Sequence, residues 1–171
     1  MKKIKYGIIG SGVMGREHIR NIELIGNAEV VALCDSHEPS INSSLEIINN
    51  VQVFQNHLEL INANIVDAYI IATPNFTHID ILKDIVQTKA HLLVEKPLCT
   101  TIDDCMEFKK LANGYPGVIW TAMEYRYMPP VARFIEEIHK GTVGNLKMLT
   151  IREHRFPFLV KVNDWNRFSK N

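Results

Sequence analysis

Three glycines near the N-terminus stand at the spacing of a phosphate-binding turn. Gly10, Gly12 and Gly15 follow an apolar run at residues 4–9 and open a segment with helical periodicity. In such a turn the first glycine makes the tight bend, the second lets a pyrophosphate approach the backbone, and the third lets the helix pack against the strand. The amides and the positive end of the helix then face the phosphates. We therefore expect a dinucleotide to contact Gly10, Ser11, Gly12, Val13, Met14 and Gly15.

An acidic residue follows the second apolar run at a distance that suits the same ligand. Asp35 closes the run at residues 29–34, where a carboxylate accepts hydrogen bonds from the adenosine ribose hydroxyls. Its negative charge repels a 2′-phosphate, so the pattern favours NAD over NADP as the cofactor. Taken alone, Asp35 also suits a helix N-cap or a turn. A protonated His37 would still accommodate a phosphate.

The sequence TPNFTH at residues 73–78 follows the fourth apolar run of the chain. Ligands of a parallel sheet bind along the edge where the carboxyl ends of its strands lie. Thr73, Asn75 and His78 are therefore candidates for contacts with the cofactor. The same pattern also suits a capped helix start, with Asn75 or Thr77 as the N-cap and His78 packed in the first turn.

The tripeptide Glu95-Lys96-Pro97 ends the fifth apolar run, and it is expected to border the cofactor at the same edge. An ammonium group beside a substrate hydroxyl stabilises the negative charge that develops on oxygen as hydride leaves carbon. We therefore predict that Lys96 is catalytic and that Glu95 holds it in place. A cis Lys96–Pro97 bond would turn the chain sharply and aim Lys96 inward. Without this context, Glu95 and Lys96 would suit an ordinary surface pair.

Strands and helices alternate over residues 1–124, and this alternation predicts how the motifs are positioned. Strongly apolar runs separated by helical patterns indicate βαβ units and a parallel sheet. The expected fold class is α/β, a doubly wound parallel sheet of the Rossmann type. Strands are expected near residues 4–9, 29–34, 51–54, 67–72, 91–94 and 117–123, with helices near 13–25, 39–50, 58–63, 79–86 and 102–112.

The remaining residues, 125–171, differ in character. A helix is expected from Pro129 to about Ile138, and residues 146–152 then alternate apolar and polar side chains, which predicts a strand with one wet face. A lone strand is not stable by itself. We therefore expect the start of an incomplete α+β domain, and its unpaired strand suggests a homo-oligomer.

Composition indicates an ordinary globular protein and excludes several classes of partner. Nineteen basic residues balance nineteen acidic ones, so no electrostatic case exists for nucleic acid or an anionic membrane. The three cysteines form no CxxC pair, which predicts a reducing compartment and no disulfide framework. The seven histidines show no metal-ligand spacing, so no metal is expected. We expect a cytoplasmic protein.

Together, the glycine turn, Asp35, the TPN-x-x-H loop and the EKP tripeptide resemble the Gfo/Idh/MocA family of NAD(P)-dependent oxidoreductases. That family includes glucose–fructose oxidoreductase and inositol 2-dehydrogenase. The resemblance implies hydride transfer between nicotinamide and a secondary alcohol of a sugar or cyclitol. It also implies that Lys96 contacts both substrate and nicotinamide. It adds three residues to the expected cofactor contacts: Arg126, Trp165 and Arg167.

The family's catalytic histidine and aspartate lie in a helix after a glycine pair, which this sequence does not contain. We therefore expect a fragment that has no assigned general acid or base and is inactive by itself. The alternative is a non-catalytic NAD-binding module that senses the cofactor or docks a partner.

Overall fold

The computed structural model of the chain describes residues 2–154 and 160–167. Six parallel strands form one sheet in the order β3-β2-β1-β4-β5-β6. This order, with every pair of neighbouring strands parallel, is that of a doubly wound dinucleotide-binding sheet, as the sequence predicted. The strands are β1 (Ile4–Ile9), β2 (Ala28–Cys34), β3 (Gln52–Phe54), β4 (Ala68–Ile71), β5 (His91–Glu95) and β6 (Ile119–Ala122).

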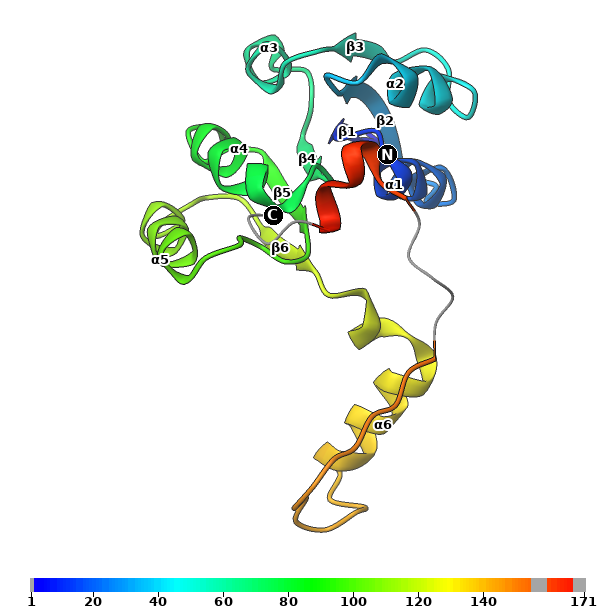
Figure 1. The fold of residues 1–171 in the computed structure, drawn as a ribbon, viewed down its shortest axis with the longest axis vertical. Helices are drawn as coiled ribbons and strands as arrows, with labels where there is room; N and C mark the ends of the chain where they lie inside the picture. Colours follow the sequence, from blue (N-terminus) through cyan, green and yellow to red (C-terminus); the bar gives the residue numbers. More distant parts are fainter. Residues whose placement is uncertain (1, 155–159, 168–171) are drawn as a thin grey trace. The chain divides into compact units, whose positions relative to one another are not determined.

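Helices cover both faces of the sheet (Figure 1). On one face lie α1 (Val13–Glu23) and α2 (Glu38–Leu45), and on the other lie α3 (His57–Ala63), α4 (His78–Ile85) and α5 (Ile102–Leu111). Neighbouring strand residues point to opposite faces, so each face has its own core. Ile8 belongs to the cluster with Ile19 and Ile22 of α1, whereas Ile9 belongs to the cluster that contains Leu82 of α4 and Phe108 of α5.

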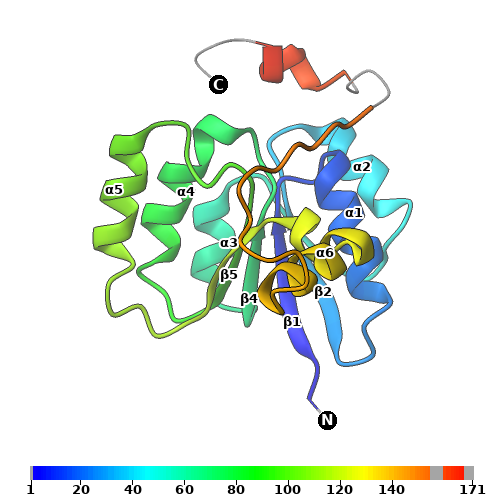
Figure 2. The ribbon, with the colours of Figure 1, turned by 90° about the horizontal axis from the view of Figure 1, so that it is seen from below.

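The strand order reverses at β1, which pairs with β2 on one side and β4 on the other. In register, Ile9 lies opposite both Cys34 and Ile71, and Ile71 lies opposite Val94. The loops after β1, β2, β4 and β5 therefore leave the sheet at one edge. In Figure 2 the chain enters β1 at the lower end of the view, so this carboxyl edge is the upper one. All four predicted motifs lie along it.

Helix α2 is shorter than the periodicity of residues 39–50 predicted. It ends at Leu45, and the chain then turns through Asn50, whose φ is 61°. Asparagine tolerates the left-handed region better than other residues with a Cβ. The apolar spacing continues beyond the helix because Ile48 still packs into the core of the α1 face.

A break in the contacts between Ala122 and Met123 divides the chain, and Met123–Trp165 form a second compact unit. It holds the 3₁₀ turn η2 (Glu124–Tyr127), helix α6 (Pro129–His139) and most of the turn η3 (Val162–Arg167). The strand predicted at residues 146–152 is not formed, because this segment has no hydrogen-bonded partner strand among the described residues. Self-association through this segment stays a prediction. No helix among the described residues is both long and apolar enough to cross a membrane.

Candidate cofactor site

The three glycines of the turn have three different surroundings. Gly10 has a φ of 94°, and a Cβ atom there would lie 2.6 Å from the carbonyl carbon and oxygen of Ala72. A Cβ atom on Gly15 would lie 2.0 Å from the carbonyl oxygen of Gly10. On Gly12 it would meet no atom within 4 Å. Gly10 and Gly15 are therefore required by the fold itself, whereas Gly12 leaves open space in front of the backbone.

The N-terminus of α1 is suited to an anion. Its N-cap is Gly12, which has no side chain to occupy the first amides, and no acidic residue stands in the first turn. The positive end of the helix dipole and the backbone N–H groups of the first turn favour a negatively charged ligand at a helix N-terminus. Val13 and Met14 keep 37% of their surface exposed beside it. The open space at Gly12 and the uncapped helix fit the pyrophosphate of a dinucleotide.

Asp35 links the end of β2 to the glycine turn. Its Oδ2 accepts hydrogen bonds from Ser11 N at 2.7 Å and Ser11 Oγ at 3.2 Å, and its Oδ1 accepts from His37 N at 2.9 Å. Ser11 is fully buried, and its carbonyl oxygen accepts from Ser44 Oγ at 3.0 Å. The Ser11 side chain therefore shapes the turn from behind and does not reach the open edge. Asp35 is half-buried, and its contact with a ribose stays a prediction.

The loop after β4 is built around a buried histidine. His78 begins α4 and has no exposed surface. Its Nδ1 lies 3.0 Å from the carbonyl oxygen of Pro97, and its Nε2 lies 3.1 Å from that of Thr73. His78 is therefore packed in the first turn of the helix, which is one of the two alternatives that the sequence left open. Asn75 is half-buried in η1 (Asn75–Thr77).

The N-cap position of α4 belongs to Thr77, but its hydroxyl does not cap the helix. Thr77 Oγ1 instead donates to the Pro74 carbonyl at 2.7 Å and lies within hydrogen-bond distance of Thr73 Oγ1, at 2.8 Å. These bonds hold the half-buried Thr73 at the carboxyl edge. Contacts of Thr73, Asn75 and His78 with a cofactor stay predictions.

The tripeptide after β5 places one buried acid beside one exposed cation. Glu95 is 7% exposed, whereas Lys96 and Pro97 are exposed. The Lys96–Pro97 bond is cis, as considered from the sequence. Glu95 does not pair with the Lys96 ammonium group in the structure; its Oε2 accepts from Lys96 N at 3.3 Å. The Lys96 side chain thus stays exposed just after β5, at the carboxyl edge of the sheet.

The partner of the Glu95 side chain is a residue that sequence reasoning missed. His18 of α1 places its Nε2 2.7 Å from Glu95 Oε1. It stands three positions after Gly15, next to the face of α1 that buries Gly15, Ile19 and Ile22. A polar side chain bordering that buried face was a signal, but the sequence did not reveal which acid it meets, since Glu95 lies 77 residues away.

Three expected contacts involve residues that follow β6 in the chain. Arg126 is exposed in η2, and Trp165 lies in η3 within the second unit. The side chain of Arg167 lies outside the described part of the chain. Their contacts with a cofactor stay predictions.

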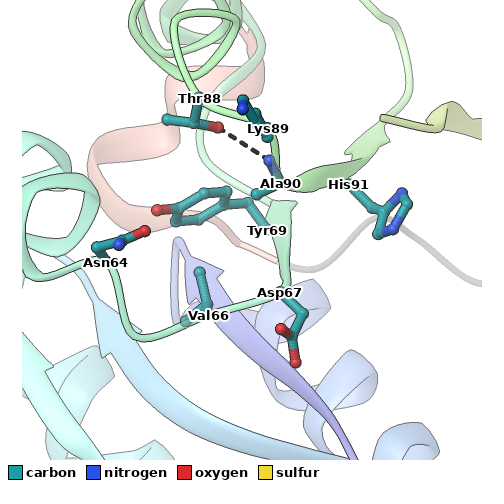
Figure 3. Close-up of a pocket in the computed structure, with 8 residues that line it drawn as sticks. All are labelled: Asn64, Val66, Asp67, Tyr69, Thr88, Lys89, Ala90 and His91. Atoms are coloured by element: carbon teal, nitrogen blue, oxygen red, sulfur yellow. Dashed lines mark hydrogen bonds between the residues drawn. The ribbon is translucent and has the colours of Figure 1, made fainter. Parts of the chain in front are cut away.

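A cavity of about 290 Å³ lies at the opposite edge of the sheet (Figure 3). Asp67 and Ala90 border it just before β4 and β5 begin, and Thr88 Oγ1 accepts from Ala90 N at 3.2 Å. The side chain of Tyr69 extends toward Asn64. The glycine turn follows β1 and the tripeptide follows β5, both at the carboxyl edge. The dinucleotide site is therefore assigned by its chemistry and not by the presence of a cavity.

Comparison with known proteins agrees with this geometry. A family model for Gfo/Idh/MocA, described as an oxidoreductase family with an NAD-binding Rossmann fold, matches residues 4–123. The chain is 28% identical over 151 residues to the rhizopine catabolism protein MocA of Rhizobium meliloti, covering 88% of this chain and 47% of that protein. It is 30% identical over 154 residues to glucose-6-phosphate 3-dehydrogenase of Bacillus subtilis (strain 168), covering 90% and 42%.

Solved structures give the same result. Myo-inositol dehydrogenase from Lactobacillus casei, in complex with NAD(H) and myo-inositol, superposes with a TM-score of 0.78 at 25% sequence identity. The match covers 83% of this chain and 43% of that one. The chain therefore spans less than half the length of each of these proteins.

Proposed function

This chain belongs to the Gfo/Idh/MocA oxidoreductase family, in which it supplies an NAD-binding Rossmann domain, and from that premise we propose the reaction it serves. The protein that carries this chain transfers hydride between NAD and a secondary alcohol of a sugar or cyclitol. Support comes from relatives named for such compounds, a sugar phosphate in one case and an inositol in another. The observation that carries the proposal is that Lys96 is exposed at the carboxyl edge of the sheet, the same edge at which the glycine turn lies.

The residues of the edge divide between the two halves of the cofactor. Gly12 and the first amides of α1 would hold the pyrophosphate, and Asp35 would accept the adenosine ribose hydroxyls. A dinucleotide crosses such a sheet where the strand order reverses, so the loops after β4 and β5 would hold its second nucleotide. Bound there, NAD supplies the acceptor for the hydride. Lys96 belongs to the loop after β5.

Lys96 would act on the oxygen of the reacting alcohol. As the C–H bond breaks, its two electrons leave with the hydrogen, and negative charge builds on the oxygen while the hydroxyl proton departs to a base. An ammonium group that donates a hydrogen bond to this oxygen stabilises the charge more in the transition state than in the ground state. No described residue is assigned as the base.

A turnover assay tests the proposal. The protein that carries this chain is incubated with NAD and a panel of sugars and cyclitols, and the absorbance of NADH is followed. We expect turnover on one compound class and a loss of at least about a thousandfold in Lys96→Met. Saturable NAD binding without turnover on any compound would contradict the proposal and favour a non-catalytic NAD-binding module.

A further inference from the structure

One short contact joins two parts of the candidate site that are far apart in the chain. His18 Nε2 lies 2.7 Å from Glu95 Oε1, and the two side chains keep 17% and 10% of their surface exposed. His18 stands in the second turn of α1, the helix that begins at the glycine turn. Glu95 is the last residue of β5, next to Lys96. The contact therefore connects the pyrophosphate-binding helix to the tripeptide that carries the ammonium group.

The carboxylate of Glu95 uses both of its oxygens in this connection. While Oε1 meets His18, Oε2 accepts the backbone N–H of Lys96 at 3.3 Å. A carboxylate at this depth needs hydrogen-bonding partners, because an unpaired charge in a poorly hydrated place is strongly unfavourable. If His18 is removed, Glu95 has to rotate toward water to regain partners. The backbone N–H of Lys96 would then lose its acceptor.

We propose that His18 is a positioning residue that acts through Glu95 to hold Lys96 at a set distance from the pyrophosphate-binding end of α1. The inference rests on the proposed function, since it assumes that Lys96 serves the nicotinamide half of the cofactor. The adenosine half depends on Gly12 and Asp35, which His18 does not touch. Loss of His18 should therefore weaken the nicotinamide contacts selectively.

Calorimetric titration with two ligands tests this selectivity. ADP carries the adenosine and pyrophosphate groups alone, whereas NADH adds the nicotinamide half. In His18→Leu we expect the affinity for NADH to fall about tenfold, within the range of coupling between contacting residues. We expect the affinity for ADP to change by less than twofold. His18→Gln keeps an N–H at the end of a side chain of similar reach and should restore most of the NADH affinity.

A second histidine provides a matched control. His57 Nε2 also lies 2.7 Å from a carboxylate oxygen, Oδ2 of Asp84, in a pair that joins α3 to α4. His57→Leu removes an equally short pair and should leave the ratio of the NADH and ADP affinities unchanged. An unchanged ratio in His18→Leu would overturn the inference. Equal losses for both ligands would overturn it as well, since they indicate a general effect on the fold.

A measurement without cofactor separates this inference from the proposed function. In the ligand-free protein, the backbone amide resonance of Lys96 should shift in His18→Leu, return in His18→Gln, and stay in place in His57→Leu. An unmoved Lys96 amide in His18→Leu overturns the positioning role even if NAD binds. Absence of both NADH and ADP binding in the unaltered chain would instead contradict the proposed function.

Discussion

A Cβ atom on Gly15 would lie 2.0 Å from the carbonyl oxygen of Gly10, so helix α1 packs against the end of β1 at a distance that only glycine permits. Gly15→Ala must push the helix away from the sheet or distort the turn. We expect the free energy of unfolding to fall by about 3 kcal/mol, the upper range for overpacking, as measured by urea denaturation. Gly26→Ala serves as the control because a Cβ atom there meets nothing within 4 Å. Equal stability of the two variants would contradict this packing.

Gly12 should behave in the opposite way. Its Cβ position is open and its φ of −67° suits any residue. Gly12→Ala should therefore cost about 1 kcal/mol or less, the value of an altered N-cap. The added methyl group stands where the pyrophosphate approaches, so the Kd for NAD should rise at least about tenfold. Calorimetry together with denaturation checks both parts, and a variant that binds NAD normally would place the pyrophosphate elsewhere.

Asp35 should determine the choice between NAD and NADP. Asp35→Asn keeps the size of the side chain and an oxygen for the Ser11 amide, but it removes the charge that repels a 2′-phosphate. The ratio of the NADP and NAD affinities should rise about tenfold or more. Competition titrations with the two cofactors measure this ratio. An unchanged ratio would show that Asp35 serves only the glycine turn.

His78 should contribute to stability through the two loops it contacts. With His78→Leu, the imidazole between the carbonyl groups of Thr73 and Pro97 is lost, and a buried carbonyl oxygen left without its donor costs about 1–3 kcal/mol. We expect a loss of about 2–3 kcal/mol in urea denaturation. His139→Ala, at an exposed position in α6, should change stability by less than about 0.5 kcal/mol. Similar values for both variants would contradict the structural role of His78.

The free energy of unfolding should fall at alkaline pH because a cysteine thiol and a tyrosine hydroxyl are buried. Burial, with a smaller contribution from Asp35, raises the pKa of Cys34 from 9.0 to about 12. Burial likewise raises the pKa of Tyr69 from 10.0 to about 12. The unfolded chain ionises first, so stability is complete below pH 9 and is lost as pH rises toward 12. Each group adds a slope of about 1.4 kcal/mol per pH unit. Cys34→Ala should lower the slope measured above pH 9, and an unchanged slope would contradict the burial effect.

Much of the first unit was predictable from the sequence because local and global signals agree there. Apolar runs such as residues 4–9 and 29–34 became β1 and β2, and the glycine spacing predicted the turn that the clash distances at Gly10 and Gly15 now explain. The match of the family model confirms the resemblance and the NAD-binding fold. The strands and the glycine turn depend mainly on residues that are close together in the chain. The periodicity of apolar residues and the positions of turn residues therefore predict them.

Two features were not predictable for the same physical reason. The contact of His18 with Glu95 depends on how α1 crosses the end of β5, and no spacing rule joins residues 77 positions apart. The alternation at residues 146–152 predicted a strand, but this segment forms none in the structure. A strand exists only with a hydrogen-bonded partner. A sequence pattern indicates which secondary structure a segment can adopt, and the segments packed or paired with it determine whether that structure forms.

Calorimetric titration of NAD into the unaltered chain and into Gly12→Ala tests the central claim most directly. The claim is that the backbone in front of Gly12 receives the pyrophosphate of the cofactor. We predict saturable heat with one NAD per unaltered chain, and an affinity at least about tenfold lower in a Gly12→Ala variant that remains folded. No heat from either NAD or NADH with the unaltered chain, or equal affinity of both proteins, would contradict the claim.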